Sequence, residues 1–160
     1  MNIGVVGLGL IGGSIAKAIK ENTSHTVYGA DIEEPVLLKA KLMEAIDGEL
    51  TAEAFSLCDM IILALYPEAT IDYVKSKGDS FKKGAAVIDC AGIKRQVCDA
   101  LFPLAREKGF TFIGGHPMAG IERSGFDNSF KSLFNNASMI LVPDGAADIR
   151  ITDEIRKFFL

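Results

Sequence analysis

The sequence predicts an α/β fold with a doubly wound, mostly parallel sheet and helices on both faces. Short apolar segments alternate with longer amphipathic ones from the first residues onward, which is the pattern of strand–helix–strand units. The segment 60–65, MIILAL, is apolar without interruption, as expected of a central strand that is covered on both faces. A glycine-rich turn directly after the first apolar segment also predicts this fold class. At 160 residues the chain has the size of one domain.

The glycine-rich turn predicts a dinucleotide-binding site. The spacing G-x-G-x-x-G between a strand and a helix is typical of Rossmann-type domains. The first glycine allows the backbone to turn, the second admits a pyrophosphate, and the third lets the helix approach the strand. Free N–H groups at the start of the helix would hold the phosphates. We therefore expect cofactor contacts from the residues of this turn, Gly7, Leu8, Gly9, Leu10, Ile11 and Gly12.

Asp31 is the expected partner of the adenosine ribose. It follows the predicted second strand, 26–30, and lies about 20 residues beyond Gly12, where such domains place an acid for the ribose hydroxyls. No Arg or Lys occurs in 32–34, so a 2′-phosphate would meet only negative charge. The sequence therefore favours NAD over NADP. The alternative is a surface acid that caps the next helix.

Periodicity and turn residues define the other elements of the first half. An isoleucine at every fourth position predicts a helix that begins at residue 11 and ends at the 22–24 turn. Pro35 suits the first turn of a helix over 35–43. A brief strand is expected near 45–46, followed by one or two helical turns at 52–57.

The second half alternates in the same way. A helix over 69–77 ends at a glycine, a strand covers 85–89, and further strands are expected over 110–113 and 138–142. Pro103 inside the helical pattern 96–108 predicts a kink or two short helices. A last helical pattern begins at residue 149. Phe126, Phe130 and Phe134 are spaced by four, which predicts one helical face. We expect this face to pack into the core, and we prefer that interpretation to stacking on a substrate.

The carboxyl ends of the parallel strands should carry the remaining ligand contacts, because ligands bind at that edge of a doubly wound sheet. Two strand ends supply the further expected cofactor contacts Leu65, Tyr66, Pro67, Cys90 and Ala91. A thiolate nucleophile at Cys90 is an alternative to its role as a small packing residue, which we also expect of Cys58 and Cys98.

His116 is the candidate for acid–base chemistry. It is expected on the loop after the strand 110–113, at the same edge as the cofactor, and histidine can take up a proton at neutral pH. The alternative is a loop histidine that satisfies a backbone group.

Composition excludes several other classes. A formal charge of −4 without a basic block argues against nucleic-acid binding. No apolar run has the length of a membrane span and no signal-peptide pattern precedes the first strand, so we expect a cytoplasmic protein without a membrane partner. Three cysteines without C-x-x-C spacing and two histidines predict neither a disulfide framework nor a metal site.

Three motifs together resemble the prephenate and arogenate dehydrogenases of tyrosine biosynthesis. They are GLGLIGGS near the amino terminus, the acid Asp31, and the stretch H-P-M-A-G-x-E-x-S-G that runs from His116 to Gly125. The resemblance implies an NAD-binding Rossmann domain over 1–147. It also implies that 148–160 starts a helix leading to a C-terminal helical domain, absent from this chain, that forms a homodimer and completes the substrate site.

The resemblance further implies NAD-dependent oxidative decarboxylation of prephenate to 4-hydroxyphenylpyruvate, or of arogenate to tyrosine. His116 would accept the proton of the substrate hydroxyl, Glu122 would order or gate the site, and Ser124 would make a polar contact. Gly92 stands where the family often carries a serine, which puts a side-chain contact from that position in doubt.

Two other functions remain open. One is another Rossmann dehydrogenase, of the β-hydroxyacid type, whose catalytic lysine lies in a later helical domain. The other is a module that binds NAD without turnover. Since the resemblance places part of the substrate site outside this chain, we expect these 160 residues alone to have little dehydrogenase activity.

Overall fold

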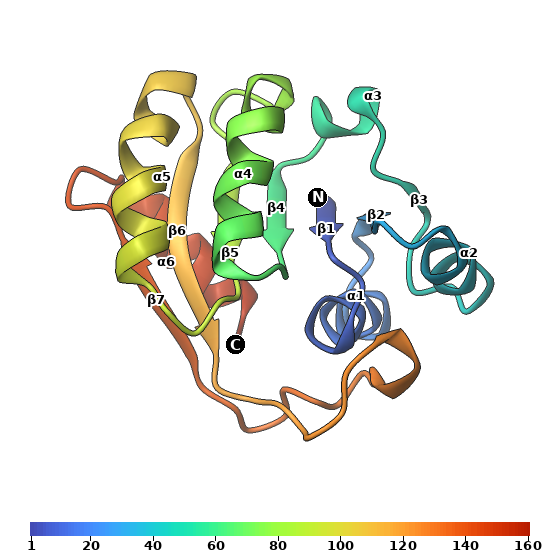
Figure 1. Ribbon diagram of the computed structural model, residues 1–160. Coiled ribbons are helices and arrows are strands. Elements are labelled where there is room, and N and C mark those ends of the chain that lie inside the picture. The colour runs from blue at the N-terminus through green and yellow to red at the C-terminus, as the bar shows by residue number, and fades with distance from the viewer.

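The computed structural model describes all 160 residues and contains one seven-stranded sheet (Figure 1). The strand order is β3-β2-β1-β4-β5-β6-β7; β1 to β6 are parallel and β7 runs antiparallel to β6. The strands are β1 (Asn2–Val6), β2 (Thr26–Ala30), β3 (Gly48–Glu49), β4 (Met60–Leu63), β5 (Ala86–Asp89), β6 (Thr111–Pro117) and β7 (Met139–Pro143). The predicted doubly wound, mostly parallel fold is confirmed. The chain order reverses between β1 and β4, and such a reversal opens a ligand crevice at the carboxyl ends of the strands.

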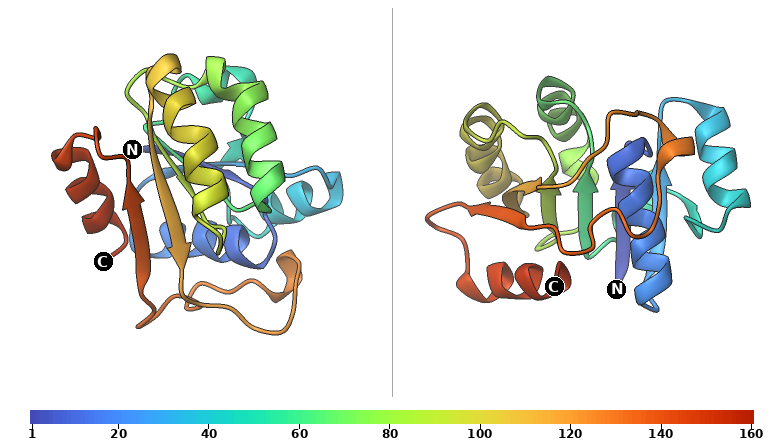
Figure 2. Two further views of the ribbon diagram at one scale, coloured as in Figure 1. Left: turned by 60° about the vertical axis from the view of Figure 1, so that its left-hand side comes forward. Right: turned by 90° about the horizontal axis from the view of Figure 1, so that it is seen from below.

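Helices cover both faces of the sheet (Figure 2). They are α1 (Leu10–Asn22), α2 (Glu34–Leu42), α3 (Ala52–Phe55), α4 (Pro67–Lys77), α5 (Arg95–Lys108) and α6 (Ile149–Phe158), with the short 3₁₀ turns η1 (Gly78–Ser80) and η2 (Phe126–Asn128). In the view from below, α4 and α5 lie on one side of the sheet, and α1 and α6 lie on the other. None of these helices has the length and apolar character that crossing a bilayer requires.

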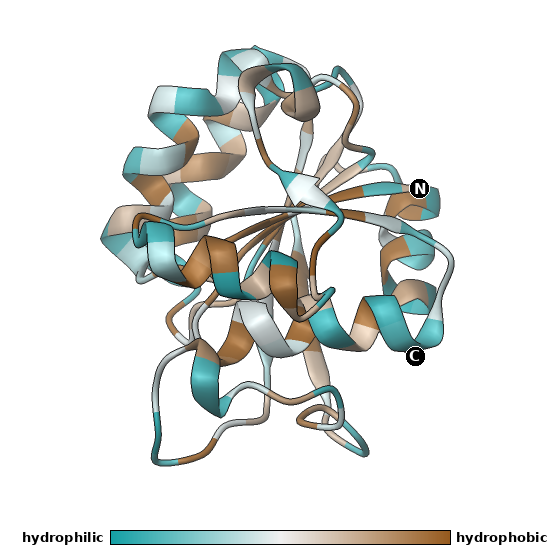
Figure 3. Ribbon diagram, turned by 90° about the vertical axis from the view of Figure 1, so that its right-hand side faces the viewer, coloured by the Kyte–Doolittle hydropathy of each residue, from teal (hydrophilic) through white to brown (hydrophobic).

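The core is divided between the two faces of the sheet, each with a cluster of 17 buried apolar residues. Successive residues of β4 alternate between the clusters: Ile62 joins the α1 and α6 side, whereas Ile61 and Leu63 join the α4 and α5 side. This division explains why β4 is apolar without alternation. Strands are drawn largely in hydrophobic colours in Figure 3, whereas the helices carry both kinds of residue.

The helix α6 packs on the sheet through its apolar side. Ile155 is 1% exposed, and Ile151, Phe158 and Phe159 pack against the same cluster as α1. Of the last three residues, which are all apolar, only Leu160 is exposed, at 90%. The apolar residues near the end of the sequence are therefore part of this domain's core.

Two expected strand boundaries were wrong. The third strand is Gly48–Glu49, because Ala45 and Ile46 are buried in the core just before the chain pairs with β2. The strand β6 continues to Pro117, so His116 lies within a strand and not on the loop after it. The cause is pairing with the antiparallel strand β7, in which His116 is opposite Ile140.

Two expectations about helices were also wrong. The helix α5 is one element with Pro103 inside it. Both Pro103 and Asp99 are exposed, so water can serve the Asp99 carbonyl that a proline four residues later leaves free. No helix spans the three phenylalanines at 126–134: Phe126 is buried in η2, whereas Phe130 is 39% exposed. Contacts of this segment with α1, described below, replace helical hydrogen bonds.

Candidate functional site at the carboxyl edge of the sheet

The glycine-rich turn has the geometry that its spacing predicts. Gly7 has φ +81°, and a Cβ there would lie 2.6 Å from the carbonyl oxygen of Ala64 in the neighbouring strand connection. A Cβ on Gly12 would lie 1.9 Å from the carbonyl oxygen of Gly7, so only glycine lets α1 start this close to β1. Nothing lies within 4 Å of a Cβ built on Gly9, which leaves that side of the turn open.

The amino end of α1 is available to an anion. Its N-cap is Gly9, no side chain caps the helix, and no acidic residue lies in its first turn. Four backbone N–H groups at a helix start lack partners within the helix, and the helix dipole makes this end positive. The open side of the turn and these donors together could hold a phosphate.

Asp31 follows β2 at the same edge and supports the glycine turn directly. Its Oδ2 accepts a hydrogen bond of 2.7 Å from the backbone N–H of Leu8, and its Oδ1 accepts one of 3.0 Å from Glu33. Leu8 is fully buried. Because each carboxylate oxygen can accept more than one hydrogen bond, Asp31 can hold the turn and still receive ribose hydroxyls. The sequence signal identified the acid but not this bracing contact.

Leu65, Tyr66 and Pro67 lie where β4 passes into α4. The Leu65 side chain packs against the turn, since one of its methyl carbons is 2.8 Å from a Cβ built on Gly7. Tyr66 is the N-cap of α4 and is 86% exposed, and Pro67 begins that helix. Leu65 thus borders the nucleotide crevice, and Tyr66 faces solvent.

His116 and Gly92 come together across the gap between two strand ends. A Cβ built on Gly92 would lie 3.6 Å from Nε2 and 3.7 Å from Cε1 of His116. These are ordinary contact distances, and Gly92 does not have a left-handed backbone. A Cβ would therefore fit at this position, so the contact with the imidazole does not by itself require a glycine.

The surroundings of Cys90, the cysteine at this edge, disfavour a thiolate. Burial, together with the charge of Asp89, raises the pKa of the Cys90 thiol to about 12, so the thiol stays protonated. Burial likewise raises the pKa of Cys58 to about 11 and raises that of Cys98. All three cysteines are free, as expected of packing residues. No group of three or more His, Cys, Asp or Glu side chains lies close enough to hold a metal ion.

Glu122 and Ser124 lie on the exposed segment that leaves β6 and reaches η2 beside α1 (Figure 1). The Ser124 carbonyl oxygen accepts a hydrogen bond of 2.7 Å from Asn128, which shapes the turn into η2. The structure does not pair either side chain with another residue of the chain. Their roles at the site stay predictions.

The segment after His116 is tied to α1 by contacts that sequence reasoning missed. Ser14 Oγ accepts a hydrogen bond of 3.0 Å from the backbone N–H of Phe130. Lys17 Nζ donates to the carbonyl oxygen and to Oγ of Ser129, each at 2.8 Å, and lies 4.3 Å from the ring centroid of Phe126. The helix that starts at the phosphate site thereby anchors the segment that follows His116.

A buried acid near His116 and its partly buried lysine partner were also missed in the sequence. Asp89 ends β5 and is fully buried, and Lys94 Nζ bonds to its carboxylate. The only sequence signal was an acid at the end of an apolar strand with a lysine five residues later.

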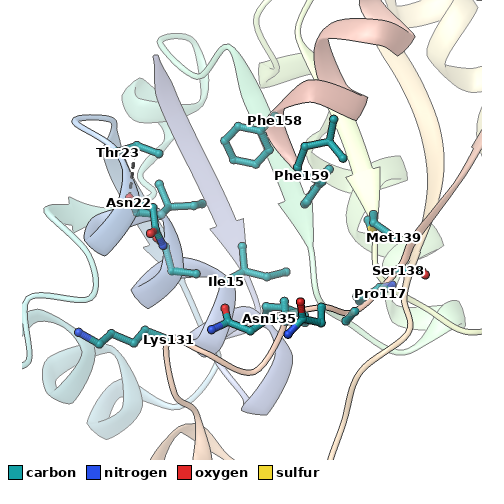
Figure 4. Close-up of a pocket in the computed structure, with 16 residues that line it drawn as sticks. Ile15, Asn22, Thr23, Pro117, Lys131, Asn135, Ser138, Met139, Phe158 and Phe159 are labelled. Atoms are coloured by element: carbon teal, nitrogen blue, oxygen red, sulfur yellow. Dashed lines mark hydrogen bonds between the residues drawn. The ribbon is translucent and has the colours of Figure 1, made fainter.

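A hollow of about 660 Å³ lies on the α1 and α6 face of the sheet (Figure 4). Ile15 and Ile19 of α1 form one wall, and Phe158 and Phe159 of α6 form another. Pro117, the residue after His116, lines the hollow. The glycine turn, Asp31 and His116 itself do not. This hollow is therefore separate from the candidate nucleotide crevice.

A family model described as "Prephenate dehydrogenase, nucleotide-binding domain" matches residues 15–160. The chain belongs to this family. The matched residues begin after the glycine turn, so the interpretation of that turn rests on its own geometry.

Curated relatives agree with this assignment. The chain is 30% identical over 157 residues to the prephenate dehydrogenase of Bacillus subtilis, covering 96% of this chain and 42% of that protein. It is 32% identical over 143 residues to the prephenate dehydrogenase of Lactococcus lactis, covering 88% and 40%. The chain thus spans less than half the length of these relatives.

Solved structures show the same architecture. Prephenate dehydrogenase from A. aeolicus, in complex with hydroxyphenyl propionate and NAD+, matches with a TM-score of 0.87 and 28% identity, over 99% of this chain and 56% of that one. Synechocystis arogenate dehydrogenase matches with a TM-score of 0.89 and 28% identity, over 98% and 55%. A 3-hydroxyisobutyrate dehydrogenase from Mycobacterium tuberculosis, at 16% identity over 96% of this chain and 50% of that one and a TM-score of 0.74, shares the fold alone.

Proposed function

We propose that this chain is the NAD-binding part of an enzyme that oxidatively decarboxylates prephenate or arogenate in tyrosine biosynthesis. The observation that carries the proposal is the position of His116. Its imidazole lies at the carboxyl edge that also holds the glycine turn and Asp31, with its Nε2 facing a glycine that leaves room for a ligand. Membership of the prephenate dehydrogenase family supports this proposal.

The residues of the crevice suit NAD. The open face at Gly9 and the uncapped start of α1 would take the pyrophosphate, and Asp31 would accept the ribose hydroxyls. The acids that follow Asp31 disfavour a 2′-phosphate. The related structure from A. aeolicus is a complex with NAD+.

The chemistry divides between the cofactor and His116. Bound NAD+ supplies the acceptor for a hydride from the ring carbon that bears the hydroxyl. His116 takes the hydroxyl proton as carbonyl character develops at that carbon. It returns the proton to the same oxygen when carbon dioxide leaves and the ring becomes aromatic, so the reaction releases no net proton. A positioned general base of this kind contributes about 10²- to 10⁴-fold to the rate.

The complete enzyme is further proposed to be a cytoplasmic homodimer whose C-terminal helical domain completes the substrate site. The support is the length of the relatives, which exceed the span of this chain about twofold. The groups that distinguish prephenate from arogenate would then contact residues outside these 160.

Replacement of His116 tests the proposal. In the full gene product, His116→Asn should lower kcat by about 10²-fold or more with prephenate or arogenate while the Kd for NAD stays unchanged. His25→Asn is the matched control, since His25 is the other histidine of these 160 residues and directly precedes β2, at the amino edge of the sheet. Full turnover in the His116 variant would contradict the proposal, and so would a wild-type enzyme that oxidises neither substrate.

A further inference from the structure

Asp89 is a fully buried carboxylate whose oxygens are all occupied from within the chain. Oδ1 accepts a hydrogen bond of 3.0 Å from the backbone N–H of Gly115. Oδ2 accepts one of 3.0 Å from Ala91 N–H and another from Lys94 Nζ. The Lys94 ammonium also donates to the carbonyl oxygen of Gly115. One ion pair therefore holds both backbone groups of Gly115 and both ends of the loop 91–94.

These bonds lie on either side of the point where Gly92 faces the His116 imidazole. Ala91 and Lys94 bracket Gly92 in the loop, and Gly115 directly precedes His116 in β6. Gly92 has no side chain that could reach the imidazole. The distance between the loop backbone and His116 is consequently set by how Asp89 and Lys94 hold the two segments.

The strands around the ion pair have the shape that it requires. A Cβ on Gly115 would lie 2.3 Å from the carbonyl oxygen of Asp89, so β5 and β6 approach more closely here than a side chain would allow. A Cβ on Gly114 would lie 3.2 Å from Cδ of Lys94, so the lysine stem crosses β6 over a glycine. Two consecutive glycines thus open the path by which Lys94 reaches a buried acid.

We infer that Asp89 and Lys94 are positioning residues for His116, which hold its imidazole against the Gly92 backbone at the geometry that proton transfer needs. The inference rests on the proposed role of His116 as the base. A buried ion pair is weak evidence for stability, because desolvation of both charges offsets their attraction, and its best-supported use is to specify one arrangement. A catalytic group displaced by about 1 Å can lose about 10²-fold in rate.

Lys94→Met and the double variant Asp89→Asn/Lys94→Met test this inference. The single variant leaves a buried carboxylate without its cation and risks unfolding, whereas the double variant is neutral and keeps an amide oxygen for one of the two backbone donors. Lys82→Met is the matched control, because it removes a lysine that pairs with Asp59 at 2.6 Å in an exposed position near the amino ends of the strands.

Two measurements separate positioning from general loosening. In the full gene product, kcat for prephenate or arogenate should fall on the order of 10²-fold in both variants with an unchanged Kd for NAD. Proton NMR should show a nuclear Overhauser effect between the His116 Cε1 proton and the Gly92 α-protons in the wild type, which the double variant loses and Lys82→Met keeps. Loss of the corresponding signals in His116→Asn assigns the His116 imidazole, and their retention in His25→Asn checks that assignment.

A folded double variant that keeps this Overhauser effect or keeps kcat overturns the inference, as does a fall in kcat accompanied by an equal loss of NAD affinity. Failure of the proposed function gives a different result. A wild-type enzyme that oxidises neither substrate refutes that function, and the Overhauser effect alone then decides whether Asp89 and Lys94 position the imidazole.

Discussion

Replacement of Asp31 by serine should weaken both NAD binding and the fold, because the carboxylate that braces the glycine turn is also the proposed partner of the ribose. In the structure Asp31 Oδ2 is 2.7 Å from the Leu8 nitrogen, and a serine hydroxyl is too short to replace that acceptor. The Leu8 N–H, on a fully buried residue, would then lack a partner. A buried donor left without a partner costs about 1–3 kcal/mol, so the free energy of unfolding should fall by that amount.

The effect on cofactor choice is separate from the effect on stability. A hydrogen bond to a charged group contributes about 1.5–3 kcal/mol, so losing two ribose contacts weakens NAD binding by about 3 kcal/mol or about 10²-fold. For NADP the variant instead removes repulsion between Asp31 and the 2′-phosphate, which at 4 Å and an effective dielectric constant near 20 is about 4 kcal/mol before solvent screening. Both effects lower the ratio of the Kd for NADP to that for NAD, which should therefore fall by at least about 10²-fold.

Calorimetric titration with each cofactor and thermal unfolding of the free protein measure the two effects. Glu34→Ser is the control, since it removes a negative charge from an exposed position nearby that holds no part of the turn. If the ratio of the Kd for NADP to that for NAD is unchanged in Asp31→Ser, Asp31 does not contact the ribose. An altered ratio with unchanged stability would show that the Leu8 contact does not support the turn.

Two further predictions follow from local geometry. Gly9→Ala should weaken NAD binding but keep the melting temperature, because its Cβ meets nothing in the chain yet occupies the open side of the turn. Gly12→Ala should weaken NAD binding and also lower the free energy of unfolding by about 1–3 kcal/mol, because its Cβ would overlap the Gly7 carbonyl. Equal melting temperatures of the two variants would contradict this prediction. Burial raises the pKa of Cys58 to about 11 from an ordinary value near 9, so between these pH values the folded state keeps a proton that the unfolded state loses. Stability should fall as pH rises through this range, by up to about 1.4 kcal/mol per pH unit, and Cys58→Ala should flatten that dependence in denaturant titrations. If Cys58→Ala leaves the pH dependence of stability unchanged, that dependence comes from other titratable groups.

Much of the candidate site follows from local sequence patterns. The glycine spacing predicted the turn because a left-handed φ at Gly7 and the close approach at Gly12 each require a residue without a side chain. The central strand was recognisable because burial on both faces needs an unbroken apolar run. Asp31 and His116 were found because strand ends at one edge of a parallel sheet converge on the same crevice.

The errors have a common physical origin in pairing between distant segments. His116 was expected on a loop because the residues around it, GGHP, carry no strand signal; the antiparallel partner β7, more than twenty residues later, makes them a strand. The phenylalanines at 126–134 have helical spacing, yet hydrogen bonds to Ser14 and Lys17 of α1 fold that segment into turns.

Fold class, phosphate turn and candidate base could thus be read from residues that are close in sequence, because backbone strain and apolar periodicity act within a few positions. The hydrogen bond by which Asp31 braces the turn, and the ion pair of Asp89 and Lys94 beside His116, could not be predicted in this way. These contacts join residues 23 and 26 positions apart, Leu8 with Asp31 and Asp89 with Gly115. They form only when the parallel register brings separate strand ends together, and nothing in the local chemistry of an aspartate specifies which distant backbone group it will meet.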